Sequence, residues 1–175
     1  MCKIFIEENG AYSIDCTNAV WATDKIHSDF QDSKALLSDV DFIIESDNYI
    51  FMVEYKNANI PGAVNPNRFN PNDDKKFNTV VKKFYDSLHY LRLLDKSKPV
   101  QYIYVVEYPK GDKVTRAKLR NRLKTNLPFD LQNNIGTGIK LIDKVAVLSI
   151  NEWNTDPIYK NYPIMPVTEE NKVKE

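Results

Sequence analysis

Two short apolar runs joined by a polar turn are the clearest pattern in the chain. They cover residues 41–45 (DFIIE) and residues 51–56 (FMVEYK). Runs of this length, rich in Ile, Val and Phe, are typical of β-strands. Asp47 and Asn48 form the expected two-residue turn, because both residue types tolerate the positive φ that such turns require. The pattern predicts an antiparallel β-hairpin.

The turn fixes which residues of this hairpin face each other. It places Ile43 opposite Met52 and Asp41 opposite Glu54. Because strand side chains alternate between faces, Asp41, Glu54 and Lys56 share one face. The other face is apolar and is expected to pack in the core; it carries Phe42, Ile44, Phe51, Val53 and Tyr55.

A long helix and a further strand follow the hairpin. Residues 73–94 are expected to be helical, with Asn72 or Asp73 as the cap. Residues 100–107 form an apolar strand. A strand, helix and strand of these lengths imply a right-handed parallel crossover. We therefore expect an α/β fold with a mixed β-sheet flanked by helices. The helical apolar stripe consists of Phe77, Val80, Val81, Phe84, Leu88 and Leu91.

The first 16 residues predict a second hairpin, for which two registers compete. One register pairs Ile6 with Tyr12, Ile4 with Ile14 and Cys2 with Cys16. The other closes on Asn9-Gly10, a stronger turn signal, but sets Ile4 against Asp15. The apolar pattern favours the first register. The two cysteines are then neighbours, and we interpret them as buried thiols rather than as a disulfide or a zinc site.

The remaining segments carry weaker patterns. A short helix is expected within residues 17–38, and a polar loop over residues 57–72 either borders a site or is a disordered excursion. Residues 113–124 predict a helix capped by Asp112, and residues 141–150 a last strand. Residues 151–175 are expected to be an extended coil packed by aromatic side chains, namely Trp153, Tyr159 and Tyr162.

Composition restricts the class of protein. The chain has 175 residues, a formal net charge of zero and 42% hydrophobic residues. We expect a single domain over residues 1–165 and a frayed tail over residues 166–175. No run of 18 apolar residues exists, and the first residues lack the apolar region of a secretory signal, so we expect a cytoplasmic protein without a membrane partner.

The paired acids define the candidate chemistry. Like charges directly opposite on a sheet repel, here by roughly 3 kcal/mol at a separation of about 5 Å and an effective dielectric of about 20. A divalent cation reverses the sign of this term. Mg²⁺ is commonly held by one or two carboxylates, with waters and phosphate oxygens completing its octahedron. Asp41 and Glu54 are therefore a candidate metal site with Lys56 beside them.

Asp41 followed by Glu54-Tyr55-Lys56 resembles the D…(D/E)xK core of the PD-(D/E)xK nuclease superfamily. The resemblance covers about residues 39–107, including the helix and parallel strand after the hairpin. Val40 replaces the Pro of the motif's name. Many members also place a Glu on a helix before the core; none is assigned here, and Glu7 and Glu8 are candidates only in name.

The resemblance implies a restriction endonuclease-like core and a Mg²⁺- or Mn²⁺-dependent endonuclease that hydrolyses phosphodiester bonds in DNA. Asp41, Glu54 and Lys56 would be its catalytic residues. Asp41, Glu54 and the backbone carbonyl of Tyr55 would hold the metal, and Lys56 would orient the attacking water or the scissile phosphate. Since restriction enzymes and resolvases of this type are often dimers, a homodimer is one implied assembly.

Basic residues supply candidate DNA contacts. Positively charged side chains at spacings of three and four on the helix of residues 113–124 form either a phosphate-binding stripe or a solvated face. Two adjacent lysines stand off the apolar stripe of the longer helix, and one arginine lies in the polar loop. The predicted nucleic-acid contacts are Arg68, Lys82, Lys83, Arg116, Arg120 and Lys124.

Other interpretations remain open at this stage. Asp39 and Lys56 could form a plain ion pair, with Asp41 and Glu54 pointing into water. His27, among several aspartates, could be a metal ligand or general base, or simply solvated. The whole chain could be a catalytically inactive nuclease-like module that binds DNA or a protein partner, or a small interaction domain that docks an acidic partner.

Overall fold

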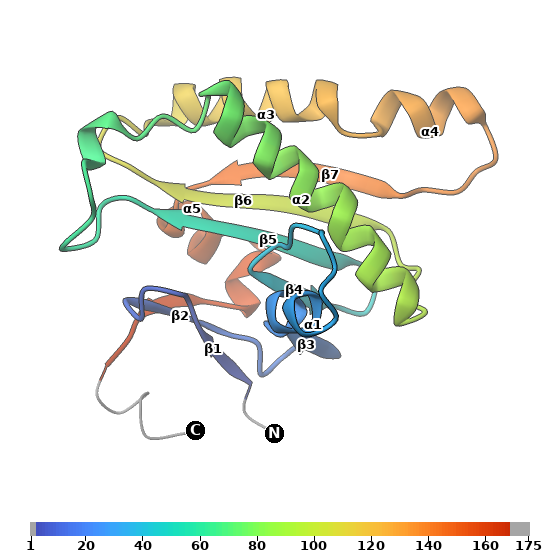
Figure 1. Cartoon of the computed structure of the whole chain (residues 1–175), viewed down its shortest axis with the longest axis horizontal. Coiled ribbons are helices and arrows are strands. Elements are labelled where there is room, and N and C mark those ends of the chain that lie inside the picture. Colours follow the sequence, from blue (N-terminus) through green and yellow to red (C-terminus); the bar gives the residue numbers. More distant parts are fainter. Residues whose placement is uncertain (1–2, 169–175) are drawn as a thin grey trace.

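A computed structural model describes residues 3–168 of the chain. Its centre is an open, mixed five-stranded sheet with helices on its faces, as the sequence predicted (Figure 1). The order is β3-β4-β5-β6-β7; neighbours from β3 to β5 are antiparallel and those from β5 to β7 are parallel. The strands are β3 (Trp21–Thr23), β4 (Phe42–Glu45), β5 (Ile50–Asn57), β6 (Val100–Glu107) and β7 (Ile142–Leu148).

The predicted hairpin and crossover are confirmed. Ile43 lies opposite Met52 in the β4–β5 pair, and β5 continues through α2 (Asp74–Leu93) into the parallel strand β6. The carboxylate of Asp73 accepts a hydrogen bond from the Lys76 N–H at 3.3 Å and so caps α2. The hairpin therefore has the register that aligns Asp41 with Glu54.

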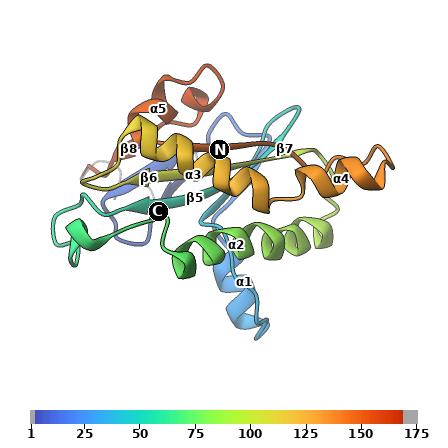
Figure 2. The ribbon, with the colours of Figure 1, turned by 90° about the horizontal axis from the view of Figure 1, so that it is seen from above.

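Helices α2 and α3 (Lys113–Asn126) lie next to one another on one face of the sheet (Figure 2). Arg122 of α3 joins them, because its guanidinium donates to Asp74 and to the Asn72 carbonyl, both at 2.6 Å. Asp112 caps α3 as predicted. The same layer includes α1 (Ile26–Asp32), which confirms a short helix within residues 17–38, and α4 (Phe129–Ile135), which was not predicted. The buried helix residues include Phe77, Val80, Phe84, Leu91, Leu119 and Leu123.

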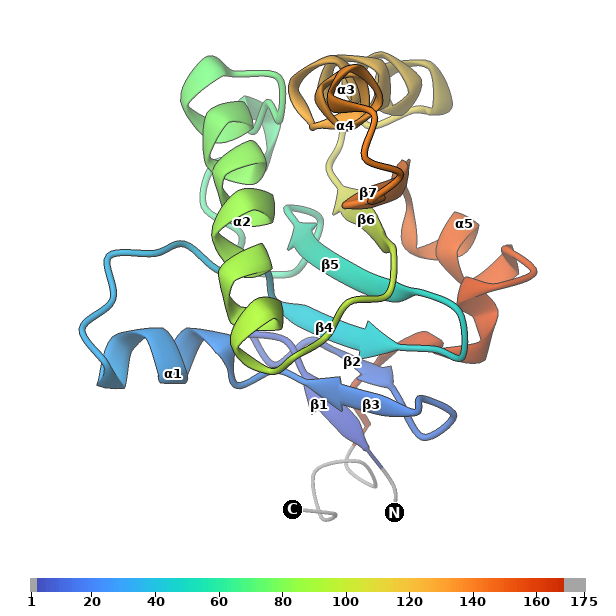
Figure 3. The ribbon, with the colours of Figure 1, turned by 90° about the vertical axis from the view of Figure 1, so that its right-hand side faces the viewer.

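A second, three-stranded sheet and α5 (Ile150–Thr155) cover the opposite face (Figure 3). The sheet has the order β1-β2-β8, from β1 (Ile4–Ile6), β2 (Tyr12–Asp15) and β8 (Ile164–Pro166). The predicted apolar face of the hairpin packs here, in a core that contains Phe42, Ile44, Phe51, Val53 and Tyr55.

The extended coil expected over residues 151–175 is wrong. Ser149 and Glu152 form a capping box that starts α5, and a 3₁₀ turn, η2 (Tyr159–Asn161), precedes β8. Trp153, Tyr159 and Tyr162 are buried, as expected. Of the tail expected over residues 166–175, Pro166 ends β8, and residues 169–175 lie outside the described part of the chain.

The preferred register of the first hairpin is also wrong. Ile4 lies opposite Asp15, which is the register that closes on Asn9-Gly10. The side chain of Glu7 decides the outcome, because its carboxylate accepts hydrogen bonds from the N–H groups of Asn9 and Ala11 at 2.8 and 2.7 Å. Gly10 supplies the positive φ of +70° in this turn.

Only one of the two cysteines belongs to the described part of the chain. Cys2 lies outside the described residues, so its pairing with Cys16 does too. Burial raises the pKa of the Cys16 thiol to about 12.

The polar loop after β5 contains one 3₁₀ turn, η1 (Pro66–Arg68). Within residues 3–168, no helix has the length and apolar character needed to cross a membrane.

Candidate functional site

Asp41 is held at the start of β4 by the segment that precedes it. The Val40 N–H donates to the Oγ of Ser87 at 3.2 Å, and the Ser38 N–H donates to Asp86 at 2.7 Å. Both acceptors belong to α2. The chain therefore enters β4 attached to this helix, which brings the Asp41 side chain between α2 and the end of β5.

The carboxylate of Asp41 contacts the backbone of β5 beyond Val53, the last residue of β5 that pairs with β4. Its Oδ2 accepts a hydrogen bond from the Tyr55 N–H at 2.6 Å. Because the N–H and C=O groups of one strand residue point to the same edge, the Tyr55 carbonyl faces the Asp41 side as well. The family resemblance implies this carbonyl as a ligand beside the two acids.

Glu54 points from β5 towards α2 and is only 7% exposed. The Lys83 ammonium lies 2.8 Å from both of its carboxylate oxygens and 4.0 Å from Oδ1 of Asp41. The two acids thus converge on one cation, and that cation is a lysine of α2. The sequence predicted a divalent cation at the two acids and Lys83 as a nucleic-acid contact, so the position of Lys83 differs from the prediction.

Helical spacing explains why Lys83 faces the sheet. It lies three residues after Val80 and four before Ser87, and both of these residues are buried. Residues at these spacings share one side of a helix. The Lys83 side chain is accordingly only 21% exposed. This spacing is visible in the sequence, although the apolar stripe predicted for the helix excludes Lys83.

Burial and the charges of neighbouring groups shift the pKa values of Asp41, Glu54 and Lys83. Burial, together with the charge of Asp41, raises the pKa of Glu54 to about 8, although Lys83 opposes the shift. Partial burial raises the pKa of Asp41 above its usual value. The two carboxylates raise the pKa of Lys83, against the effect of its own burial. The three groups therefore titrate as a coupled set.

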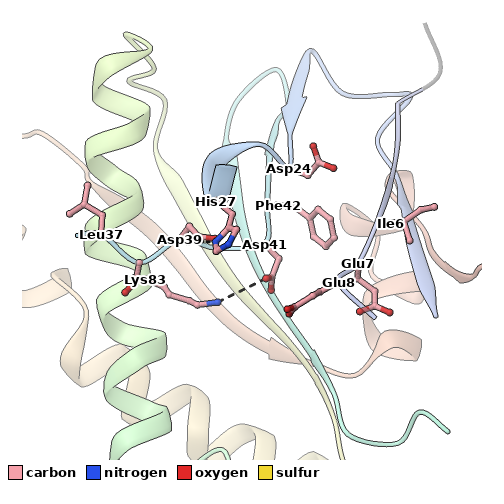
Figure 4. Close-up of a pocket in the computed structure, with 11 residues that line it drawn as sticks. Ile6, Glu7, Glu8, Asp24, His27, Leu37, Asp39, Asp41, Phe42 and Lys83 are labelled. Carbon is pink, nitrogen blue, oxygen red and sulfur yellow. Dashed lines mark hydrogen bonds and ion pairs between the residues drawn. The ribbon is translucent and has the colours of Figure 1, made fainter. Parts of the chain in front are cut away.

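A cavity of about 490 Å³ borders this cluster. Asp41 and Lys83 lie on one side of it, and Glu8 lies across from them (Figure 4). His27 also lines the cavity, and its Nδ1 lies 3.0 Å from Asp39. Asp39 thus contacts His27 rather than forming the ion pair with Lys56 considered above. The acids that line the cavity are Glu7, Glu8, Asp24, Asp39 and Asp41.

Lys56 lies on the same face of β5 as Glu54 and is exposed near the end of that strand. No ion pair within residues 3–168 involves it. Its ammonium is therefore available to a ligand that approaches the strand end.

The donor set fits a hard divalent cation by charge and by atom type. Two carboxylates and the Tyr55 carbonyl supply oxygen ligands of the kind that Mg²⁺ and Mn²⁺ prefer. The ammonium of Lys83 already places one cation at the acid pair. Within residues 3–168, no group of three or more His, Cys, Asp or Glu side chains is arranged to hold a metal. A site here would use two carboxylates.

The predicted DNA contacts fall into two groups. Arg68, Arg120 and Lys124 are exposed and form no ion pair within residues 3–168. The others form ion pairs: Lys82 pairs with Asp86, Lys83 pairs with the two acids, and Arg116, which is 9% exposed, donates to Glu152 at 2.9 Å. The basic stripe on α3 is thus interrupted at Arg116.

Comparison of the chain with protein-family models, with curated proteins and with solved structures found no match.

Proposed function

We propose that this protein is a metal-dependent nuclease that hydrolyses phosphodiester bonds in DNA. The observation that carries the proposal is the convergence of Asp41 and Glu54, from adjacent antiparallel strands, on one cation beside a cavity. A hairpin, a helix and a parallel strand in this order also support a restriction endonuclease-like core, since the sequence resemblance covers the same elements.

Each residue has a role that its position supports. Asp41, Glu54 and the Tyr55 carbonyl would hold Mg²⁺ or Mn²⁺. When bound, the metal supplies a water of lowered pKa and charge stabilisation at phosphorus. Lys56, exposed at the end of β5, would hold the scissile phosphate. The acidic cavity wall repels phosphate, so the cation and Lys56 together must attract the substrate.

Cleavage of DNA by site variants tests the proposal. Wild-type protein is expected to cut duplex or branched DNA with Mg²⁺ or Mn²⁺ and not with EDTA. Glu54→Gln and Lys56→Ala should each lower the single-turnover rate by at least about a hundredfold. Glutamine preserves the volume of Glu54, and Lys56 is exposed, so circular dichroism should show an unchanged fold.

Lys160→Ala is the matched control for charge removal. Lys160 is exposed on η2, which lies on the face of the sheet opposite to α2, so this variant should cut at the wild-type rate. Cleavage that survives both Glu54→Gln and Lys56→Ala would show that the activity comes from elsewhere.

A second candidate is a nuclease-like module that binds DNA without cutting it. The Lys83–Glu54 contact favours it, because an internal lysine already neutralises the buried acid. This candidate requires salt-sensitive DNA binding without cleavage in the presence of Mg²⁺. The cleavage assay therefore separates the two.

A further inference from the structure

We infer that Lys83 is an internal counter-ion that competes with the catalytic metal: it occupies the cation position of the acid pair and leaves it when the metal binds. The inference rests on the proposed function. Lys83 would neutralise Glu54 while no metal is bound, and its displacement would limit the affinity of the Asp41–Glu54 site for the metal.

The contact distances place Lys83 where a metal would need to bind. Its Nζ lies 2.8 Å from Oε1 and 2.8 Å from Oε2 of Glu54, so it occupies the space in front of both oxygens. It is also 4.0 Å from Oδ1 of Asp41. An ammonium and a divalent cation repel each other strongly at such separations, so both cannot occupy the pair at once.

Burial explains why the fold needs this counter-ion. The Glu54 side chain is only 9% exposed, and a buried carboxylate without a partner is costly. The hydrogen bond from the Val40 N–H to Ser87, one helical turn beyond Lys83, fixes α2 against the start of β4. The helix therefore delivers the ammonium to Glu54 without any metal.

The cavity gives the ammonium a place to move. Lys83 lines this space of about 490 Å³ together with Glu8, Asp24 and Asp39. A lysine ammonium on a flexible four-carbon stem can exchange one carboxylate for another by rotation about its side-chain bonds. The acidic wall can thus receive the charge that the metal displaces.

Calorimetric titration with Mn²⁺ tests the competition. Lys83→Met removes the charge but keeps a long side chain, and it should bind Mn²⁺ at least about tenfold more tightly than wild type, because the competing cation is gone. Lys75→Met is the matched control: Lys75 is exposed on the same helix, and its replacement should leave the affinity unchanged.

The outcomes separate this inference from the proposed function. Equal or weaker Mn²⁺ binding by Lys83→Met, with binding retained in wild type, would overturn the competition and leave the metal-dependent nuclease intact. Absence of Mn²⁺ binding in all three proteins would contradict both.

A measurement on the wild-type protein covers the case in which Lys83→Met fails to fold. Acetylation of Lys83 by acetic anhydride, mapped by mass spectrometry, should be slow in EDTA, because two carboxylates shield the ammonium. The rate should rise on addition of Mg²⁺, while that of Lys75 stays constant. Equal protection of Lys83 with and without saturating Mg²⁺ would overturn the inference.

Discussion

Glu54 is the residue whose surroundings have the clearest consequence for stability. Its carboxyl lies against α2, and both of its oxygens contact Lys83. Burial raises the pKa of Glu54 from 4.5 to about 8. The folded protein therefore binds a proton that the unfolded chain releases over this interval.

The stability of the metal-free protein should fall as pH rises. Between about pH 4.5 and about pH 8, the folded state binds more protons at Glu54 than the unfolded state does, so stabilisation present at the acid end is lost at the alkaline end. Urea denaturation in EDTA at a series of pH values measures this slope. Glu54→Gln should flatten it, whereas equal slopes in the two proteins would contradict the assignment.

At the residue scale, the sequence predicted that Asp41 and Glu54 lie together, but not that Lys83 contacts them. The juxtaposition of Asp41 and Glu54 follows from strand alternation and one turn, both local properties. The identity of the contacting cation depends on how α2 lies over the sheet. That orientation depends on tertiary contacts, such as the hydrogen bond from the Val40 N–H to the Ser87 hydroxyl. Such contacts are not visible in the sequence pattern.

Among the elements, the two hairpins show when a sequence pattern decides the register. In β4–β5, the apolar alternation and the polar turn agree, and the predicted register is confirmed. In β1–β2 they conflict, and the turn determines the register because the Glu7 carboxylate accepts several N–H groups there. Hydrogen bonds from backbone N–H groups to a side-chain carboxylate within a turn can therefore outweigh the alignment of a few half-buried apolar side chains.

Helix α3 carries basic residues with different roles. Arg116 is buried and contacts Glu152, so Arg116→Ala should lower the free energy of unfolding by about 1–2 kcal/mol. Arg120 is exposed, so Arg120→Ala should leave stability within about 0.5 kcal/mol of wild type. It should instead weaken DNA binding and reduce the salt dependence by about one phosphate contact.

Urea denaturation measures the stability of the two variants. Fluorescence anisotropy of labelled DNA at several salt concentrations measures their affinity for DNA. Weaker DNA binding by Arg116→Ala without any loss of stability would contradict the structural role of this residue. An unchanged affinity and salt dependence in Arg120→Ala would remove α3 from the proposed DNA surface.

In the whole molecule, charge is unevenly distributed even though the net charge is zero. Acidic side chains line the cavity beside Asp41, while exposed basic residues lie on α3. Helix α2 lies beside α3 (Figure 2). It contacts the acid pair through Lys83, and α3 through the Arg122–Asp74 ion pair. A DNA strand bound to α3 would therefore need a cation at Asp41 and Glu54 before its phosphates could enter the acidic cavity.

The sequence predicted the central layer more completely than its surroundings. The β4–β5 hairpin, α2 and β6 follow from strong local periodicity and one handedness rule. The β1–β2 hairpin of the second sheet was predicted, but its third strand was not, because β8 is short and pairs with β2, far away in the chain. Its formation depends on the buried aromatic residues before it, and their packing places the last strand against β2.

Titration of Mn²⁺ into wild-type protein and Asp41→Asn is the most direct test of the central claim. Asparagine can still accept the hydrogen bond from the Tyr55 N–H, so the variant should unfold at the wild-type denaturant concentration. Wild type should bind Mn²⁺, and Asp41→Asn should bind it at least about tenfold more weakly. Equal binding by the two proteins, or no binding by wild type, would contradict the proposal that these carboxylates hold a catalytic metal.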